Sequence, residues 1–351
     1  MTGPPLNAQI GRYLNARAGV LCDVPGFPSR IRLKKRGSIY LASVIFADRS
    51  EHQLVIKPMS RDAQVSGPAE LMRIQRNLRS RDRDLAGQLV DILDSHAEPS
   101  WIVMPVVAGE TLEALLHRSL KSRVPAKQCV AEAAVKKLAG ALAALHEIPA
   151  RQLGLRPGCQ RNAQYLPVMR QLWAKHPLAV RALTPGITVA QILERVIGGD
   201  FADRCADRLV PVDVQPKNQM VDAAGRLTLI DPDYTVGHPA ITLATFLVGL
   251  DRLALRHPSR RSARRIERLK RIFVRAYARH GRAWVITDLA GFYPWALLRV
   301  YDEHAQARPW ARPYLAHVYG SAMRRFVRSV VKTGRPWSRL KQSPANLVHA
   351  A

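Results

Sequence analysis

The chain of 351 residues has few cysteines and no long apolar run. Its cysteines, Cys22, Cys129, Cys159 and Cys205, form no C-x-x-C pair, so the pattern indicates neither a zinc site nor a disulfide framework. The longest apolar stretch, 283–300, is interrupted by Asp288 and is too polar to span a bilayer. The first residues lack the charged segment and apolar core of a signal peptide. We therefore expect a soluble, cytoplasmic protein.

Acidic residues are also scarce. The chain has 54 Lys and Arg against 27 Asp and Glu, which gives a formal net charge of +27. Such a charge favours an anionic partner, which could be nucleic acid, an acidic lipid surface or an acidic substrate; alternatively, it only keeps the protein soluble. No zinc finger, helix-turn-helix or aromatic-basic RNA motif is present, so nucleic-acid binding would rest on charge alone. The absence of G-x-x-x-x-G-K-[ST] argues against a P-loop fold.

Two kinds of hydrophobic period divide the chain. Short apolar runs separated by turn residues predict antiparallel strands at 31–34, 38–46 and 53–57. A helix is predicted to begin at Pro68, with Leu71, Ile74 and Leu78 on its apolar face. Longer helical patterns follow at 111–120, 131–147, 241–255 and 260–282, and 152–207 reads as mostly helical. The sequence therefore predicts an α+β protein with a sheet first and helices after it.

The segment 209–240 carries the clearest chemical pattern. Asp213 is followed five residues later by Asn218 and thirteen residues after that by Asp231. Two short strands, 218–221 and 226–230, are predicted around a turn at 222–225. In an extended segment residues i and i+2 share a face, so Asp231 and Asp233 are predicted to reach one divalent cation.

This spacing suits phosphoryl transfer. The reaction needs a carboxylate for the acceptor hydroxyl and oxygen ligands that bind Mg²⁺ against the nucleotide phosphates. The strand Leu54-Val55-Ile56-Lys57 ends in a lysine, and Glu70 lies in the first turn of the next predicted helix. A glutamate there would pair with Lys57 and orient it; alternatively, Lys57 is a solvated strand end and Glu70 only favours the helix dipole.

These motifs resemble the aminoglycoside phosphotransferase and choline kinase-like family, whose pattern runs H-G-D-x-x-x-x-N and then I-D-[FP]-[DE]-[YW]. Here Asp213, Asn218 and the run Ile230-Asp231-Pro232-Asp233-Tyr234 match it. The resemblance implies a two-lobed protein-kinase-like fold. We expect a small antiparallel-sheet lobe over 1–104, a hinge over 105–110 and a larger, mainly helical lobe over 111–351.

The resemblance also implies roles for individual residues, with ATP and Mg²⁺ as cofactors. Asp213 would be the catalytic base, Asn218 and Asp231 the metal ligands, and Asp233 an auxiliary acid at the metal. Lys57, braced by Glu70, would bind the α- and β-phosphates. The remaining nucleotide contacts would come from the turn at Gly37 and Ser38 and from the hinge backbone near Met104 and Val106.

The sequence departs from the family pattern at two places. Pro211-Val212 replaces the His-Gly before the catalytic aspartate, and an aspartate expected near Thr242 is missing. A phosphotransferase acting on a hydroxyl group is therefore one hypothesis, and a catalytically impaired pseudokinase that binds nucleotide is the other. A protein kinase is disfavoured because the A-P-E and D-F-G signatures are absent.

Charge guides the expectation about partners. A protein this basic is expected to repel a polycationic acceptor. We therefore expect a hydroxylated small molecule or an anionic or lipid-linked glycan as the acceptor. Five arginines fall on one face of the predicted helix 260–282: Arg264, Arg268, Arg271, Arg275 and Arg279. Such a face can lie on an anionic membrane, which would make the protein peripheral at the inner membrane surface; alternatively, it is a solvated outer face.

Overall fold

The computed structural model describes residues 5–59, 67–155, 208–211 and 213–333. Val212 and most of the segment 152–207, predicted to be helical, lie outside these ranges. The chain divides into two compact units, the first formed by 1–110 and 218–235 and the second by 111–217 and 236–351. The predicted α+β class is confirmed, because an antiparallel sheet and a mainly helical region are both present.

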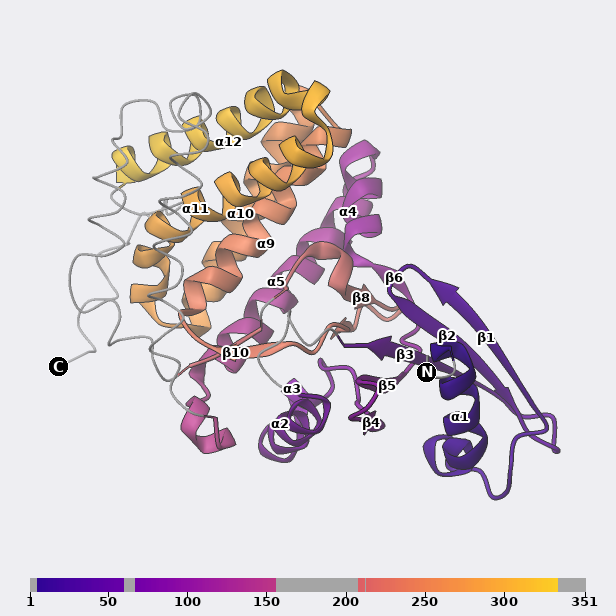
Figure 1. Ribbon diagram of the computed structural model, residues 1–351. Coiled ribbons are helices and arrows are strands. Elements are labelled where there is room, and N and C mark those ends of the chain that lie inside the picture. Colours follow the sequence, from indigo (N-terminus) through magenta and orange to yellow (C-terminus); the bar gives the residue numbers. More distant parts are fainter. Residues whose placement is uncertain (1–4, 60–66, 156–207, 212, 334–351) are drawn as a thin grey trace. The chain divides into compact units, whose positions relative to one another are not determined.

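The first unit is built on a five-stranded antiparallel sheet with strand order β1-β2-β3-β5-β4 (Figure 1). The strands are β1 (Arg30–Arg36), β2 (Ile39–Ile45), β3 (Glu51–Pro58), β4 (Asp94–His96) and β5 (Trp101–Pro105). The three strands predicted first in the chain are confirmed as β1, β2 and β3. Their alternation of apolar and polar residues leaves one face of the sheet apolar enough to bury.

Helices flank this sheet. Helix α1 (Leu6–Cys22) buries Ile10, Leu14 and Ala18 against the sheet residues Ala42 and Val44. Helix α2 (Pro68–Arg81) begins at the predicted proline and buries the predicted apolar positions, and the short α3 (Arg83–Ala86) follows it. Pro68 suits the first helical position because the N–H it lacks has no partner there in any helix.

A hairpin from later in the chain completes the first unit. Its strands are β8 (Gln219–Val221) and β9 (Leu227–Leu229), and Gly225 has a φ of 72°, as the tight turn between them requires. The N–H of Val90 donates to the carbonyl of Leu229 at 2.9 Å, and the N–H of Leu229 donates to Gln88 at 2.8 Å. The segment 218–235, which the sequence bounds included in the range of the helical lobe, groups with the first unit by its contacts.

The second unit consists mainly of helices. They are α4 (Leu112–Lys121), α5 (Pro125–Glu147), α9 (Pro239–Arg256), α10 (Arg260–His280), α11 (Ala283–Ala307) and α12 (Arg312–Thr333). The short segments η1 (Ala150–Leu153), β7 (Leu209–Pro211) and η4 (Pro309–Ala311) also belong to this unit, and β6 (Glu110–Thr111), η3 (Pro216–Asn218) and β10 (Tyr234–Val236) lie at the boundaries between the units in the sequence. Within the described ranges, no helix is long and apolar enough to cross a membrane.

Local sequence signals explain where several of these helices begin. The Thr111 hydroxyl accepts the N–H of Ala114 at 3.1 Å, and the Ser259 hydroxyl accepts the N–H of Ser262 at 3.1 Å. Each side chain satisfies a backbone donor that the first turn of a helix leaves without a partner. Helix α9 is buried along most of its length and packs against α10, α11 and α12. It is therefore the core helix of the second unit.

Candidate functional site

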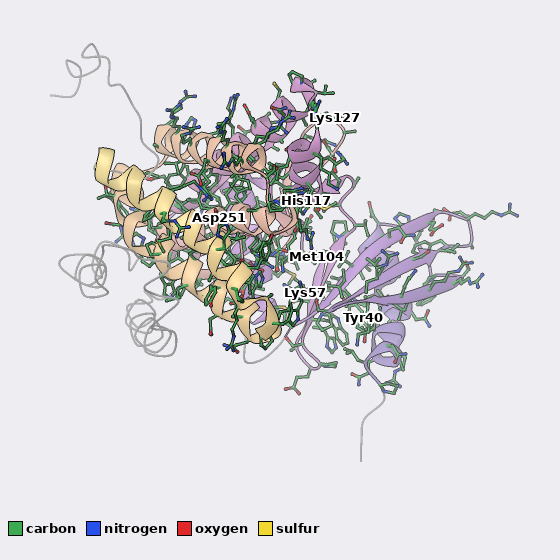
Figure 2. All side chains as sticks on the ribbon, turned by 90° about the horizontal axis from the view of Figure 1, so that it is seen from above. Tyr40, Lys57, Met104, His117, Lys127 and Asp251 are labelled. Atoms are coloured by element: carbon green, nitrogen blue, oxygen red, sulfur yellow. The ribbon has the colours of Figure 1, made fainter. Side chains whose placement is uncertain are left out.

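The two faces of the sheet have different roles. Tyr40, like its neighbours two and four residues on, points into the core beneath α1. On the opposite face the strand register aligns Lys34 with Leu41, Leu41 with Val55, and Val55 with Met104. The last three form an apolar row across the sheet, with Met104 buried. Figure 2 labels Tyr40 and Met104 on this unit. The face opposite α1 therefore offers an apolar surface suited to a flat ring.

The same face carries positive charge near its β1 edge. Because side chains alternate along a strand, Arg32, Lys34 and Arg36 share the face of Leu41, and all three are exposed. Gly37 and Ser38 form the two-residue turn to β2, and both are exposed. Gly37 has a φ of 59°, which suits such a turn and is favourable for glycine. The predicted phosphate-binding turn is thus flanked by side-chain cations.

Lys57 lies on β3 and forms an ion pair with Asp231. The two side chains are 22% and 24% exposed, so the pair is largely shielded from water. Asn218 donates its side-chain amide to the second oxygen of Asp231 at 3.4 Å. The carbonyl of Asn218 also accepts the N–H of Ile230 at 3.0 Å, which fixes the hairpin ends against each other. The structure therefore brings together three predicted residues from positions far apart in the sequence.

The donor set of this cluster fits a magnesium ion. Asp231 and Asn218 offer carboxylate and amide oxygens, the hard ligands that Mg²⁺ prefers. Within the described ranges, no three His, Cys, Asp or Glu side chains are grouped to bind a metal. Mg²⁺ sites of nucleotide enzymes commonly take only one or two protein ligands and complete their shell with phosphates and water. A two-ligand site at Asn218 and Asp231 has this character.

Asp233 is not placed as the sequence argument assumed. Strand β9 ends at Leu229, and the N–H of Asp233 donates to the carbonyl of Asp231 at 2.9 Å. This is the hydrogen bond of a three-residue γ-turn, not of an extended strand. The period-two argument for Asp231 and Asp233 sharing a face therefore does not apply, and the metal role of Asp233 stays a prediction.

Glu70 lies in the first turn of α2, as predicted, but its ion pair is to Arg73 at 3.7 Å. The ion pair that Lys57 makes among the described residues is to Asp231. The expected pair of Lys57 with Glu70 is therefore not formed here, because the hairpin places a carboxylate directly at the lysine. Glu70 is 38% exposed and keeps its favourable position at the helix N-terminus.

The hinge register revises which backbone groups are available to an adenine. The N–H of Val106 donates to the carbonyl of Gln53 at 3.2 Å, and Met104 is aligned with Val55, so both residues face β3. Pro105, between them, faces the other edge, past Val103, where the pairing with β4 ends. The carbonyl of Pro105 therefore faces the open edge of the sheet, whereas the backbone groups of Met104 and Val106 are directed towards β3. The N–H that proline lacks would have pointed to the same edge, outside the pairing with β3.

Asp213 lies in the second unit, directly after the buried strand β7. The hydroxyl of Thr242 donates to the carbonyl of Pro211 at 2.9 Å, and the Thr242 side chain is fully buried. The family pattern has an aspartate near position 242, which is missing here. The threonine hydroxyl instead supplies a hydrogen bond from α9 to the strand that leads to Asp213.

Helix α9 also contacts the loop after Asp213. Arg252 donates to the side-chain oxygen of Gln215 at 2.5 Å. A side chain at Gly249 would place its Cβ 2.6 Å from Cδ of Pro216, so only glycine lets the loop lie this close to the helix. The loop around Asp213 is therefore fixed to the core helix at several points.

Two buried histidines lie in the second unit. His238 caps α9 by accepting the N–H of Ala240 at 3.0 Å, and its other ring nitrogen lies 3.1 Å from Asp288. His146, at the end of α5, forms a hydrogen bond with the hydroxyl of Tyr277 at 2.9 Å. Burial lowers the pKa of His146 to about 3, so the ring is neutral at physiological pH. Its burial agrees with a structural role.

Sequence reasoning missed some of these residues. The contact of Thr242 had no signal, because a lone threonine in an apolar helix is usually a packing residue. His238 could have been found from the order His-Pro-Ala before an apolar run, which is typical of a capping residue followed by proline at the first helical position. Asp288 was noticed only as a charge inside an apolar stretch, and its partner is far away in the sequence.

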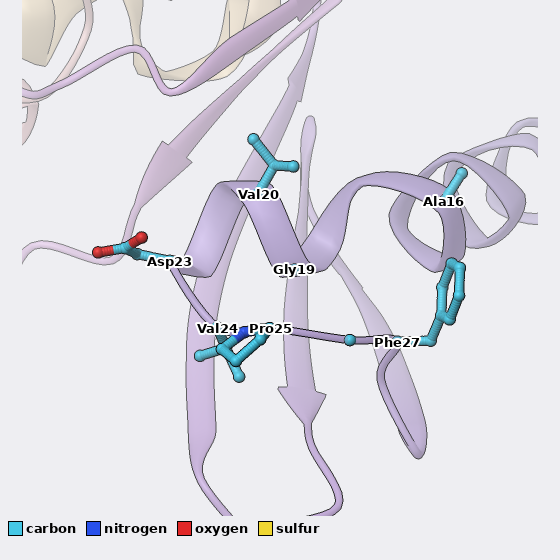
Figure 3. A pocket seen from close by; sticks show the side chains of 8 residues that line it. Ala16, Gly19, Val20, Asp23, Val24, Pro25 and Phe27 are labelled. Atoms are coloured by element: carbon cyan, nitrogen blue, oxygen red, sulfur yellow. The ribbon is translucent and has the colours of Figure 1, made fainter.

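A separate hollow of about 580 Å³ lies at the end of α1 (Figure 3). Its lining is mostly apolar, including Val20 and Phe27, and Asp23 is its charged residue. The loop lies close to the helix because Gly19 has no Cβ, which would meet the carbonyl oxygen of Gly26 at 2.5 Å. The hollow offers no groups suited to phosphate, so it is not the candidate site.

No protein-family model and no curated protein sequence matches the chain. Solved structures do match. A glucosamine kinase is 14% identical over 89% of this chain and 97% of that chain, with a TM-score of 0.50. An aminoglycoside 2'-phosphotransferase IIIa mutant bound to GDP is 12% identical over 91% and 98%, also at 0.50. An amicoumacin kinase bound to AMP-PNP and Ca²⁺ is 11% identical over 95% and 98%, again at 0.50.

These likenesses establish the fold. The chain has the protein-kinase-like fold of small-molecule phosphotransferases, which confirms the fold class expected from the motifs. The resemblance to aminoglycoside phosphotransferases is confirmed as a likeness of fold.

Proposed function

We propose that this protein is a phosphotransferase that uses ATP and Mg²⁺ to phosphorylate a hydroxyl group of a small molecule. The observation that carries the proposal is the cluster of Lys57, Asn218 and Asp231 in one compact unit. A cation beside a carboxylate and an amide, next to an apolar sheet face, is the arrangement that a metal-bound nucleoside triphosphate requires. The fold shared with nucleotide-bound kinases supports it.

Each residue has a role in this proposal. Lys57 would neutralise charge on the α- and β-phosphates. Arg32, Lys34 and Arg36 would attract the negatively charged nucleotide to this face of the sheet. Asn218 and Asp231 would bind Mg²⁺, which, when bound, neutralises the negative charge that the phosphate groups carry into the transition state. The Pro105 carbonyl would accept a hydrogen bond from the adenine amino group.

Asp213 would act on the acceptor. The acceptor oxygen forms a bond to the γ-phosphorus, the bond from that phosphorus to the bridging oxygen of ADP breaks, and the proton of the hydroxyl moves to the Asp213 carboxylate. Most of the rate enhancement would come from positioning and charge neutralisation. The high positive charge of the chain supports a neutral or anionic hydroxylated acceptor, including a glycan or a lipid-linked one.

A pseudokinase is the second candidate, and one observation favours it. The residue before Val212 is Pro211, which has no side-chain donor, where the family pattern has histidine. The hydrogen bond from Thr242 to Pro211 favours an active enzyme instead, because it supports the strand before Asp213 without the histidine of the family pattern. Turnover separates the two.

The first test is nucleotide binding, followed as the thermal shift with Mg²⁺-ATP. A ligand that binds only the folded protein raises its stability by about 2.7 kcal/mol at 100 times the Kd. We expect a shift in the wild type and in Asp91→Ala, which removes a partly exposed carboxylate elsewhere in the first unit. The shift should be lost in Asp231→Ala. Equal shifts in all three would show that Asp231 does not bind the metal-nucleotide complex.

The second test is turnover, measured as ADP formation with panels of neutral and anionic hydroxylated acceptors. Asp213→Asn should keep the thermal shift and lose ADP formation. A wild type that binds Mg²⁺-ATP and forms no ADP with any acceptor would support the pseudokinase and contradict the proposed activity.

A further inference from the structure

One end of the second unit exposes large aromatic side chains. Trp310, in η4, is 81% exposed, and Tyr314, in the first turn of α12, is 41% exposed. Tyr314 donates its hydroxyl to the carbonyl of Leu255 at 2.8 Å, which fixes the start of α12 beside the last turn of α9. A tryptophan exposed to this extent loses the hydrophobic stabilisation that burial would give it, so a partner that covers it would gain that energy.

Arginines flank Trp310 in the sequence and lie at the helix ends next to the Tyr314 contact. Arg308 and Arg312 flank Trp310 in the sequence Arg-Pro-Trp-Ala-Arg, and both are exposed. Arg256 follows Leu255 at the end of α9, and Arg260 begins α10 shortly after it. We call this surface the basic aromatic end, formed by Arg256, Arg260, Arg308, Trp310, Arg312 and Tyr314.

Few acidic groups offset this charge. Glu113 lies 3.7 Å from both Arg256 and His117, and Glu303 lies 3.2 Å from Arg299. Among the described residues, Arg260, Arg308 and Arg312 have no carboxylate within ion-pair distance. The basic aromatic end therefore has a positive field that its own acids do not neutralise.

The arginine face of α10 is a weaker candidate. Arg264, Arg271 and Arg279 are exposed, as predicted, and Arg268 pairs with Glu132 at 2.6 Å. The apolar side of α10, however, is buried against the rest of the unit, for instance at Phe273. A helix whose apolar side is already buried cannot insert it into a bilayer, so this face would interact by charge alone.

We propose that the basic aromatic end is a docking surface for an anionic lipid bilayer. Trp310 lies at the level of the lipid headgroups, where the amphipathic indole ring is most stable. Arg260, Arg308 and Arg312 contact the anionic headgroups, and Tyr314 lies beside them. A bilayer surface fits better than nucleic acid, because the sequence has no nucleic-acid motif and, in the part of the chain that the structure describes, Trp310 is the one tryptophan exposed to this extent and offers no series of stacking positions. The proposal does not depend on the phosphotransferase activity.

Flotation with lipid vesicles tests this proposal. The full chain should float with vesicles of phosphatidylcholine containing 30 mol% phosphatidylglycerol and stay behind with pure phosphatidylcholine. Each arginine near an anionic surface contributes about a fivefold gain in affinity. We therefore expect Arg260→Glu with Arg312→Glu to weaken binding by well over tenfold. Both positions are in the first turn of a helix, where glutamate favours the dipole, so the variant should fold.

Two further variants separate the alternatives. Trp310→Ala should lose most of the flotation, whereas the matched control Arg271→Glu with Arg279→Glu, which reverses the same charge on the α10 face, should keep most of it. Equal losses in the two double variants, or unchanged flotation of Trp310→Ala, would overturn the proposal in favour of binding by net charge. Tighter binding to single-stranded RNA than to the vesicles, with the same dependence on Trp310, would overturn it in favour of nucleic acid.

Discussion

Thr242 is one of the α9 residues that support the segment around Asp213. Its hydroxyl donates to the Pro211 carbonyl from inside the core, so replacing it leaves a buried acceptor without a partner. The family pattern expects an aspartate near this position, and the hydrogen bond of Thr242 ends on Pro211, two residues before Asp213 in the sequence. We infer that Thr242 helps to position Asp213, the aspartate proposed above as the catalytic base.

The prediction is that Thr242→Val lowers the free energy of unfolding by about 1–3 kcal/mol, the cost of a buried unsatisfied polar group. It should also lower the rate of ADP formation while the Kd of Mg²⁺-ATP stays unchanged. Thr242→Ser keeps the hydroxyl and should restore both properties. Thr245→Val, about one helical turn further along α9, is the matched control and should behave as the wild type. A Thr242→Val enzyme with normal turnover would contradict the positioning role.

His146 is expected to contribute to the pH dependence of stability. Burial holds its pKa near 3 in the folded protein, below the value of about 6.5 expected in the unfolded chain. Because the folded pKa is depressed, the unfolded state binds the proton first, so the contribution is complete above pH 6.5 and is lost as pH falls towards 3.

We therefore expect the unfolding free energy to fall by up to about 1.4 kcal/mol per pH unit through this window, in addition to any other titration. Urea unfolding between pH 7 and pH 4 measures it. His146→Asn, which keeps a polar group facing Tyr277, should have a shallower pH dependence than the wild type. An identical slope in the two proteins would mean that another group carries the effect.

At the scale of elements, buried charge connects three helices of the second unit. Lys270 of α10 lies 2.5 Å from Asp251 of α9 and 3.0 Å from the hydroxyl of Tyr293 of α11, and Tyr293 donates to the second oxygen of Asp251 at 2.5 Å. Lys270 and Asp251 are almost completely buried. A buried ion pair of this kind adds little net stability compared with apolar residues. Removing one partner, however, leaves the other charge buried in the core without a counter-charge.

Lys270→Met should therefore destabilise the protein by about 3–5 kcal/mol in urea unfolding. The double variant Lys270→Met with Asp251→Leu should be more stable than the single variant, because it removes the unpaired carboxylate as well. Strictly additive losses would show that the two groups act independently.

The hairpin of β8 and β9 is an element whose strands and turn follow from the sequence, whereas the unit that it joins does not. Its two strands and its turn follow from alternating apolar residues and a glycine, which are local signals. Its membership of the first unit follows from hydrogen bonds to Gln88 and Val90, and no local pattern encodes those. The same hairpin carries Asp231, which pairs with Lys57 where Glu70 was the expected partner.

At the scale of the whole molecule, charge and fold carry separate information. The net charge of +27 is a property of composition, which left both an anionic partner and a merely solubilising surface open and located no surface. The structure separates an exposed arginine face on α10 from an end where arginines flank Trp310. It is the exposure of the aromatic side chain, which composition cannot reveal, that distinguishes a docking surface from a solvated one.

The sequence by itself determined most of the described helices and strands and the residues proposed for the site. The spacing of Asp213, Asn218 and Asp231, the strand ending at Lys57, and the helical periods are local patterns, and local backbone preferences decide them. The tertiary structure decided the pairings: which carboxylate meets Lys57, which hinge group faces the open edge, and which hydroxyl holds Pro211. These depend on contacts between residues distant in the chain, where packing geometry and not local propensity selects the partner.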